Sequence, residues 1–315
     1  MNFPFISVII PTYCRERTLR DTLADVMRQE YPNFEILVID QTPTHTPETQ
    51  VYLEQLNAEK KIRWFRVDWT NLPRARNYGV CQAVGEIILF IDDDVQLTEH
   101  FLKAHARNYS ESAEIGAVAG RSLEAAILKE SHQNLSIEYL PPEAMDPAIA
   151  WYYIDLMNTL HPQQVITARG CNMSFRSEIF TKYKLWFDER FGGSAVREES
   201  DFCLRIRKTG YKIWYDPSAT LINLGESTGG CHKISTQTLE YQITHYHNHF
   251  LMAFNNLNFS ESLRFFTRLF DCDVLGNPPC NKSRFLPKIF IRGVFYILGF
   301  ISALLTIFQS FVSKI

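Results

Sequence analysis

The chain of 315 residues has no excess of charge of either sign. Its 32 basic and 35 acidic residues leave a formal charge of −3, and no long run of one sign occurs. A surface that binds nucleic acid is usually built from clustered lysines and arginines. The charge balance therefore excludes nucleic acid as an expected partner.

The sequence also lacks the cysteine pattern of a disulfide framework or a zinc ribbon. There are seven cysteines, an odd number, and none forms a C-x-x-C pair. Reduced thiols in a cytosolic compartment are therefore expected. Basic residues followed by a long apolar run are missing before Pro11, so a secretory signal is not expected.

What the chain does have is an alternation of strand and helix patterns over its first 120 residues. Short apolar runs at 6–10, 34–39, 62–67 and 86–91 predict strands, and residues 47–58 and 74–84 have helical spacing. This order is typical of an α/β fold of the Rossmann-like kind, with a mainly parallel sheet flanked by helices. Ligands bind such sheets at the carboxyl ends of the strands, where Thr12, Asp40 and Asp92 stand.

The rest of the chain is less uniform. Residues 121–165 are predicted as an irregular insertion, followed by a helix at 199–209 and a strand at 211–215 that ends before Asp216 and Pro217. C-terminal helices are expected within 235–270, and the prolines and glycine of 272–288 predict a linker.

The C-terminal segment predicts contact with a membrane. Residues 293–312 contain no charge, and twenty helical residues at about 1.5 Å each can cross a core of roughly 30 Å. Only Lys314 follows the segment, whereas four basic residues precede it: Lys282, Arg284, Lys288 and Arg292. The positive-inside rule then places the bulk of the chain at the cytoplasmic face. Alternatively, the polar residues Ser302, Thr306, Gln309 and Ser310 allow a helix that lies in the membrane plane.

Three consecutive carboxylates, Asp92, Asp93 and Asp94, directly follow the apolar run that ends at Ile91. No neighbouring residue in the sequence neutralises them, so a cation is the expected partner. Mg²⁺ or Mn²⁺ held by one or two carboxylates together with substrate phosphates is the usual arrangement at nucleotide sites. The alternative is a polar turn before a helix that starts near Thr98.

An ordered set of motifs resembles the family-2 glycosyltransferases of the GT-A fold. The resemblance covers roughly residues 6–225. Its motifs are Pro11-Thr12-Tyr13 after the first strand, Asp40 after the second, Ala75-Arg76-Asn77-x-Gly79 at a helix, the aspartate triplet, Gly170-x-Asn172-Met173, and Glu198-Glu199-Ser200-Asp201. Each motif alone is weak, but together and in order they are specific.

The resemblance implies roles for these residues. Pro11, Thr12, Tyr13 and Asp40 would hold the nucleobase and ribose of a nucleotide-sugar donor, preferably a UDP-sugar. Arg76 and Asn77 would support the nucleotide near its phosphates, and Asp92 and Asp93 would contact it. Asp92 and Asp94 would hold the divalent metal. The alternatives without a role in nucleotide binding are that Asp40 caps a helix and that Arg76 is a surface cation.

Family-2 enzymes invert the anomeric centre, so the resemblance also implies a general base for the acceptor hydroxyl of a glycan or a lipid-linked acceptor. The family usually has Glu-Asp where this chain has Glu198-Glu199, and its second acid is the base. Glu199 is therefore the expected base, with Glu198 and Asp201 in reserve. Acids at this place also favour the start of a helix electrostatically, and both explanations can hold together.

Asn223 departs from the family pattern, and three histidines further along the chain raise the question of a second metal site. Many relatives have a histidine where this chain has Asn223, and His232 is the candidate replacement as a metal ligand. His245, His247 and His249 would share one face only in a strand, and the surrounding sequence predicts a helix, which argues against a metal site there.

The resulting expectation is a catalytic domain over residues 1–232, a helical extension with a linker over 233–288, and a membrane segment over 289–315. Two other functions remain open. A sugar nucleotidyltransferase would need a glycine-rich phosphate loop after the first strand, and residues 11–17 contain no glycine. A sugar-binding or scaffold protein without activity would not need Asp92, Asp94 and Glu199.

Overall fold

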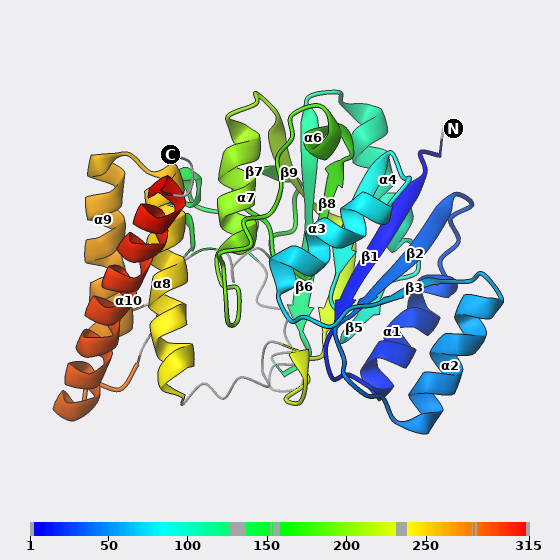
Figure 1. Cartoon of the computed structure of the whole chain (residues 1–315). Helices are drawn as coiled ribbons and strands as arrows, with labels where there is room; N and C mark the ends of the chain where they lie inside the picture. The colour runs from blue at the N-terminus through cyan, green and yellow to red at the C-terminus, as the bar shows by residue number, and fades with distance from the viewer. Residues whose placement is uncertain are drawn as a thin grey trace.

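A single sheet organises the protein. The computed structural model describes residues 3–126, 137–151, 153, 158–230, 238–278, 280 and 282–312. Within these residues, nine strands form one sheet in the order β3-β2-β1-β4-β8-β6-β9-β5, with β7 paired to β9. Figure 1 shows this sheet in the middle of the molecule, with helices in front of it and behind it.

The half of the sheet that carries the N-terminal strands is parallel. It contains β1 (Ile6–Thr12), β2 (Phe34–Asp40), β3 (Arg63–Arg66) and β4 (Ile87–Ile91). All seven residues of β1 and all five of β4 are buried, as their apolar runs predict for strands covered on both faces.

The other half of the sheet changes direction. β8 (Asn172–Arg176) is antiparallel to β4, and β6 (Ile115–Glu124) is antiparallel to β8 and parallel to β9 (Lys212–Asn223). The short strands β5 (Val95–Leu97) and β7 (Gln163–Val165) pair antiparallel with β9. The α/β prediction is confirmed, but the sheet is mixed, because β5, β7 and β8 run opposite to the other strands.

Helices cover both faces of the sheet through separate apolar cores. One core joins α1 (Arg17–Met27), α2 (Pro47–Ala58) and α4 (Phe101–Glu111) to one face. The other joins α3 (Leu72–Gln82), the short α6 (Glu178–Thr181) and α7 (Glu198–Arg207) to the opposite face.

Two predictions about the middle of the chain are wrong. β9 does not end before Pro217 but continues to Asn223, because its pairing with β6 shifts register between Asp216 and Thr220 and the proline falls at that irregularity. The region 121–165 is not a loose insertion throughout: its described residues include β7, the 3-10 turn Pro142–Met145 and the buried side chain of Trp151.

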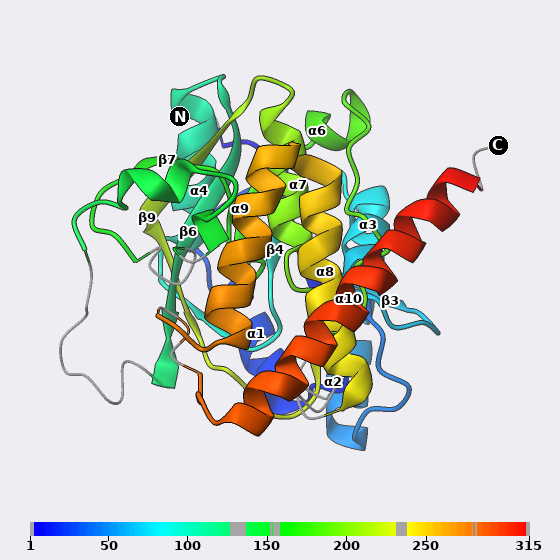
Figure 2. The ribbon, with the colours of Figure 1, turned by 90° about the vertical axis from the view of Figure 1, so that its left-hand side faces the viewer.

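The C-terminal part forms a helical layer beside α7. It consists of α8 (Leu239–Asn256), α9 (Phe259–Leu269), a π-helical turn η4 (Phe270–Val274) and α10 (Leu286–Val312). Figure 2 shows α8 and α9 side by side and α10 running diagonally across α8 on the outside. The expected linker is packed at its start, where Cys272, Asp273 and Val274 are buried.

Candidate active site

Six of the residues predicted to bind the nucleotide or the metal line a pocket of about 370 Å³ at the carboxyl ends of β1 and β4. Gly192 and Gly193 border it, and the start of α8 closes one side through Glu240. The volume lies within the range of about 300–1,000 Å³ that small-molecule sites occupy. The predicted residues that line it are Pro11, Thr12, Tyr13, Asp92, Asp93 and Asp94.

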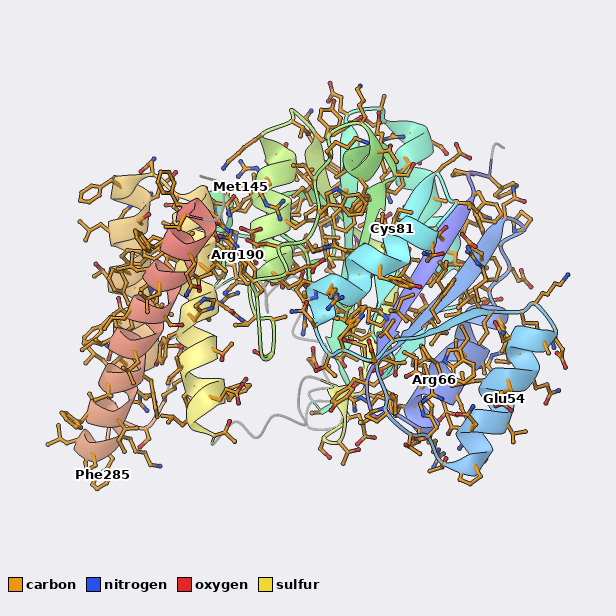
Figure 3. All side chains as sticks on the ribbon, viewed as in Figure 1. Glu54, Arg66, Cys81, Met145, Arg190 and Phe285 are labelled. Carbon is orange, nitrogen blue, oxygen red and sulfur yellow. The ribbon has the colours of Figure 1, made fainter. Side chains whose placement is uncertain are left out.

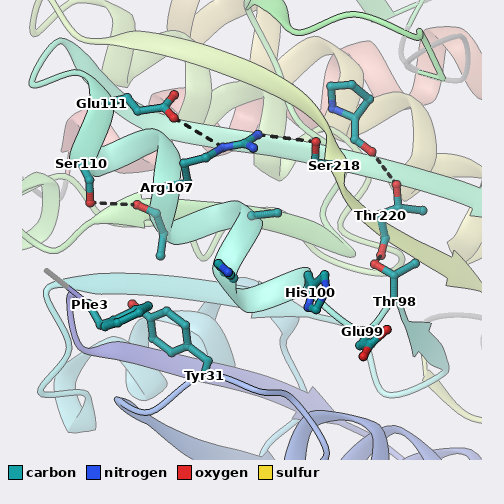
Figure 4. A pocket seen from close by; sticks show the side chains of 14 residues that line it. Phe3, Tyr31, Thr98, Glu99, His100, Arg107, Ser110, Glu111, Ser218 and Thr220 are labelled. Carbon is teal, nitrogen blue, oxygen red and sulfur yellow. Dashed lines mark hydrogen bonds and ion pairs between the residues drawn. The ribbon is translucent and has the colours of Figure 1, made fainter. Parts of the chain in front are cut away.

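A larger hollow of about 850 Å³ lies elsewhere, between Phe3, Tyr31, α4 and the residues around Ser218 (Figure 4). None of the predicted catalytic or binding residues lines it. Its walls are mainly apolar, and the Arg107 side chain near its edge is paired with Asp216. The smaller pocket is therefore the candidate active site.

The aspartate triplet has a cationic neighbour that the sequence did not reveal. Nε of Arg15 lies 3.4 Å from Oδ1 of Asp93, and its Nη2 lies 3.2 Å from Oδ2 of Asp94. The hydroxyl of Thr12 donates to the other oxygen of Asp93 at 2.6 Å. The expectation that the triplet lacks a neutralising neighbour is thus wrong, because the turn after β1 folds Arg15 back onto it.

Burial nevertheless disfavours the charged form of these acids. It raises the pKa of Asp92 to about 6, and the charge of Asp94 adds to the rise. It raises the pKa of Asp93 to about 7, against the opposing effects of Arg15 and the Thr12 hydrogen bond. A divalent cation at this place would favour the charged forms and reverse the shift.

The oxygen atoms present fit a metal that the substrate also ligates. Asp92 and Asp94 line the pocket, and carboxylates are the hard ligands that Mg²⁺ and Mn²⁺ prefer. Among the described residues, no group of three or more His, Cys, Asp or Glu side chains is placed to hold an ion by itself. The donor set therefore suits an ion that takes its remaining ligands from a diphosphate and water.

Asp40 is fully buried at the end of β2 and does not line the pocket. Oδ2 of Asp40 accepts a hydrogen bond from Nε1 of Trp64 at 2.9 Å and lies 2.9 Å from Nε2 of His45, and its Oδ1 accepts from the backbone of Thr42. Burial would raise the pKa of Asp40, but the bonds from His45 and Thr42 lower it below its usual value. The next residue, Gln41, is the one that reaches the pocket wall.

Arg76 and Asn77 do not line the pocket. The guanidinium of Arg76 pairs with the carboxylate of Glu198, and its Nη2 donates to the carbonyl of Gly170 at 3.1 Å. The amide of Asn77 donates to the carbonyl of Phe187 at 2.9 Å and accepts from the same residue's backbone N–H. Both side chains therefore join α3 to other segments, and the burial of Arg76 excludes the alternative of a surface cation. Their support of the nucleotide near its phosphates stays a prediction.

The three acids at the start of α7 have different surroundings. Glu198 is only 2% exposed and pairs with Arg76. Asp201 is fully buried and accepts hydrogen bonds from Arg205 and from Asn255 and Asn256 of α8.

Glu199 differs from both of its acidic neighbours. It is half-buried, and its Oε1 accepts a hydrogen bond from the hydroxyl of Ser200 at 3.1 Å. None of the three acids lines the pocket, but Glu199 is the one that is partly exposed and has no ion pair with a described residue. This difference favours Glu199 over Glu198 and Asp201 as a proton acceptor.

Several site residues were missed, and one prediction falls outside the described residues. His232 lies in the segment 231–237, which the structure does not describe. Asn223, at the end of β9, lines the pocket. Asn71 also lines the pocket and caps α3 by accepting a hydrogen bond from the backbone N–H of Arg74. An asparagine directly before Leu72-Pro73 is a sequence signal for the start of a helix, so this residue could have been found.

Comparisons with known proteins point to one family of enzymes. Residues 7–183 match the profile described as glycosyl transferase family 2. The Escherichia coli protein WcaA, named for colanic acid biosynthesis as a glycosyl transferase, is 33% identical over 102 residues, which cover 32% of this chain and 36% of that protein. A Methanococcus voltae glucuronosyltransferase named for a dolichyl phosphate-linked N-acetylglucosamine substrate is 25% identical over 75% of this chain and 71% of its own length.

Solved structures show the same fold at low sequence identity. Staphylococcus aureus TarS, residues 1–349 in complex with UDP-GlcNAc, aligns with a TM-score of 0.55 at 15% identity, covering 97% of this chain and 92% of that one. The Pyrobaculum calidifontis mannosyltransferase PcManGT, in complex with GDP-Man and Mn²⁺, aligns with a TM-score of 0.55 at 14% identity, covering 96% and 88% of the two chains.

Proposed function

The chain belongs to glycosyl transferase family 2, and from this membership we propose that it moves a hexosyl group from a nucleotide-diphosphate sugar, preferably a UDP-sugar, to a hydroxyl of a glycan or a lipid-linked acceptor. The observation that carries the proposal is the meeting of Thr12, Tyr13 and the three aspartates at one pocket of about 370 Å³. The UDP-GlcNAc and GDP-Man complexes of the two similar structures support the donor class.

The proposed metal is Mn²⁺ or Mg²⁺. Asp92 and Asp94 would hold it, and the ion would neutralise charge that develops on the departing diphosphate. The Mn²⁺ in the Pyrobaculum calidifontis complex supports this choice. Asp93 remains bound to Thr12 and Arg15, so its proposed role is to shape the wall that faces the nucleotide.

Glu199 is the proposed general base. In a single inverting displacement, the acceptor oxygen forms a bond to the anomeric carbon while the bond from that carbon to the diphosphate oxygen breaks. The proton of the acceptor hydroxyl passes to the Glu199 carboxylate, and the nucleoside diphosphate leaves. A positioned base of this kind typically contributes about 10²–10⁴-fold to the rate.

The buried predicted residues take supporting roles in this proposal. Asp40 holds His45 and Trp64 below the expected base-binding end of the pocket. Arg76 fixes Glu198, and so places the neighbouring Glu199 at the start of α7. Asn77 fixes Phe187 in the segment that leads to Gly192 and Gly193.

We also propose that the enzyme works at the cytoplasmic face of the cell membrane, attached by its C-terminal segment 289–315. α10 is long and apolar enough to cross a membrane, with a mean hydropathy of 2.0 in its most apolar window. The lipid-linked substrate in the name of the Methanococcus voltae relative supports a membrane-borne acceptor. Residues 1–232 would form the catalytic domain and 233–288 the connection.

A donor screen tests the proposal. The full chain in detergent is incubated with UDP-, GDP- and dTDP-sugars and Mn²⁺, and release of nucleoside diphosphate is measured together with the shift in melting temperature that donor binding causes. One donor should stabilise the protein and be turned over, and Asp94→Asn should lose both effects. Binding of sugars without any turnover, with and without added acceptor extracts, would favour a sugar-binding protein instead.

A further inference from the structure

The outer surface of α10 is apolar over almost its whole length. From position 290 to 312, the exposed side chains are Phe, Ile, Leu and Val, with Gln309 as the one polar exception in this described stretch. Phe308 and Phe311 are 64% and 65% exposed. Only 11% of the most apolar window is buried, so α10 is not the core helix of a soluble protein.

Two polar residues of α10, Arg292 and Thr306, face the protein instead of solvent. Arg292 donates to the carbonyl of Val274 at 2.9 Å through its Nε. The hydroxyl of Thr306 lies 3.0 Å from Nε2 of His247 on α8. This arrangement is the reverse of a helix on a water-exposed surface, where polar groups face outward.

α10 is attached to the protein at both ends and in the middle. Its contacts run from Arg292 to Ser310, about 27 Å at about 1.5 Å per residue. Gly299 allows the closest approach, because a side chain there would collide with Tyr246 of α8. Ser310 accepts a hydrogen bond from Arg190 at 2.9 Å. Figure 3 shows Arg190 beside the helical layer and Phe285 at its opposite end.

These attachments conflict with a helix that crosses the bilayer. Arg190 also donates to Asp188, through its Nε at 2.9 Å. A crossing α10 would carry this ion pair, and α8 with its histidines, into the hydrocarbon, where charged groups are costly. A helix lying in the membrane plane exposes only its outer face to lipid and leaves these contacts unchanged.

The charges at the start of α10 indicate which lipids it meets. The sequence contains no acidic residue after Asp273, but it contains five basic ones. Of these, Arg284 and Lys288 are exposed next to the first turn of α10. Clustered basic residues beside an apolar face attract anionic headgroups.

We infer that α10 lies flat in the interface of an anionic lipid membrane, with Ile297, Leu305 and Phe308 on its lipid side, and that it does not cross the bilayer. The orientation rests on the membrane attachment proposed above but not on sugar transfer, so vesicle binding and transfer are measured separately.

This orientation sets the distance between the lipid surface and the pocket. On one side of α8, Glu240 lines the pocket and Asn248 donates to the carbonyl of Gly192. On the other side, His247 meets Thr306 of α10. Two helices therefore separate the pocket from lipid, roughly 20 Å at about 10 Å per helix. The acceptor site would be within reach of a glycan that extends from a lipid carrier.

Binding to vesicles tests the lipid face. Full-length protein is produced in the presence of phosphatidylcholine vesicles, with or without phosphatidylglycerol, and the bound fraction is measured by flotation. Leu305→Glu should weaken the partition coefficient by about tenfold or more, since a buried leucine side chain and an added charge both count against the bound state. Val84→Glu, at a side chain 72% exposed after α3, is the matched control and should not change binding.

The same measurement distinguishes an anionic lipid surface from a second copy of the chain as the partner of the apolar face of α10. Stronger binding to vesicles with phosphatidylglycerol that salt weakens supports the anionic interface. Equal binding of Leu305→Glu and the wild type, with unchanged melting temperatures, overturns the inference. A wild-type dimer in lipid-free buffer that Leu305→Glu dissociates, together with no vesicle binding, assigns the face to a second copy and also overturns it.

Topology decides between lying flat and crossing. A cysteine added after Ile315 is treated with a membrane-impermeant maleimide on intact vesicles, and the native exposed Cys81 of α3 serves as the control for the catalytic side. If α10 lies flat, both thiols should be labelled before the vesicles are lysed. Protection of the C-terminal thiol until lysis, while Cys81 reacts, would show a crossing helix and refute the flat orientation.

Discussion

Nη2 of Arg15 lies 3.2 Å from Oδ2 of Asp94, so the carboxylate proposed to bind the metal already has a cationic partner inside the protein. Arg15 is 4% exposed and donates to the carbonyl of Glu226 as well, which holds its side chain in place. The backbone N–H of Glu226 donates to the same oxygen of Asp94 at 3.0 Å. A divalent ion at Asp94 must share the carboxylate with these donors or displace them from it.

Replacement of Arg15 by Gln is therefore expected to tighten the binding of Mn²⁺ in the absence of nucleotide. Removal of one positive charge a few ångströms from the ion should improve the affinity by about tenfold, or roughly 1.4 kcal/mol. Calorimetric titration of Mn²⁺ measures the change. Arg17→Gln is the matched control, because Arg17 is 86% exposed and pairs with Asp21 at the surface. An unchanged affinity would place the metal away from Asp94.

Replacement of Glu199 by Gln should separate binding from chemistry. The amide keeps the shape of the side chain and its contact with Ser200 but cannot accept the proton of the acceptor. Transfer should fall by about 10²–10⁴-fold, with little change in the dissociation constant of the donor. Single-turnover rates and donor titration provide the two measurements. Normal transfer by Glu199→Gln would remove Glu199 from its proposed role while leaving the family assignment intact.

Replacement of Glu198 by Gln should lower the free energy of unfolding. Arg76 and Glu198 are each only 2% exposed, so a lost carboxylate leaves a buried guanidinium without its opposite charge. Loss of one partner of a buried pair costs about 3–5 kcal/mol. Urea unfolding in detergent measures it, and Glu199→Gln, one residue away and half-buried, is the control expected to change stability little. A double variant, Arg76→Met with Glu198→Leu, should recover much of the loss.

The sequence predicts the place of Asp92 at the end of a strand but not the contact of Arg15 with the triplet. The triplet was readable because a buried strand of five apolar residues ends just before it, and the carboxyl ends of β1 and β4 must meet once the two strands pair. The partner of Asp94 was not readable, since the direction of a long side chain depends on the turn that carries it. Cys14, with a φ of 53°, lies in that turn and directs Arg15 back toward the sheet.

The same limit applies to Arg76 and Asn77. Their place at the start of a helix was predicted, but whether a side chain faces the pocket or the core depends on the elements packed above it. Gly170 was the available clue for Arg76: a Cβ at this glycine would come within 2.8 Å of Nη2 of Arg76, so the glycine marks a close approach.

The orientation of α10 was also open in the sequence, because its length fits a crossing helix and an interfacial helix equally. The small residues Gly299 and Ala303, one turn apart, were the signal that one side packs closely on another helix. The structure buries both of them against the rest of the C-terminal layer.

The pairing of His45 with Asp40 makes a pH-dependent prediction. Burial lowers the pKa of His45, but the hydrogen bonds and charges of Asp40 and Glu16 outweigh it, so the pKa lies above 6.5 in the folded protein. A raised pKa means that the folded state holds the proton more tightly than the unfolded chain. The stability gained is complete below pH 6.5 and is lost as the pH rises through the folded value.

The carboxylate of Asp40 has the opposite dependence. Its pKa is lowered, so its contribution is complete above its ordinary value of about 3.9 and disappears only as the pH falls through the lower folded value. Of these two effects, only that of His45 changes between pH 5 and pH 9, and it predicts a component of the stability that declines as the pH rises. His45→Gln should remove that component and lower the stability at pH 6, while the raised pKa values of Asp92 and Asp93, about 6 and 7, keep a decline of their own up to neutrality.

Unfolding of the full chain in detergent, followed from pH 5 to pH 9, measures the difference, and His100→Gln is the control because His100 is exposed at the start of α4. The wild type and the control should lose stability in parallel as the pH rises above 6.5, whereas His45→Gln should lose less over the same interval. Because His45 and Trp64 share the Asp40 carboxylate below the pocket, the donor affinity should weaken over the same interval. A parallel decline of all three proteins would mean that His45 is not charged in the folded state.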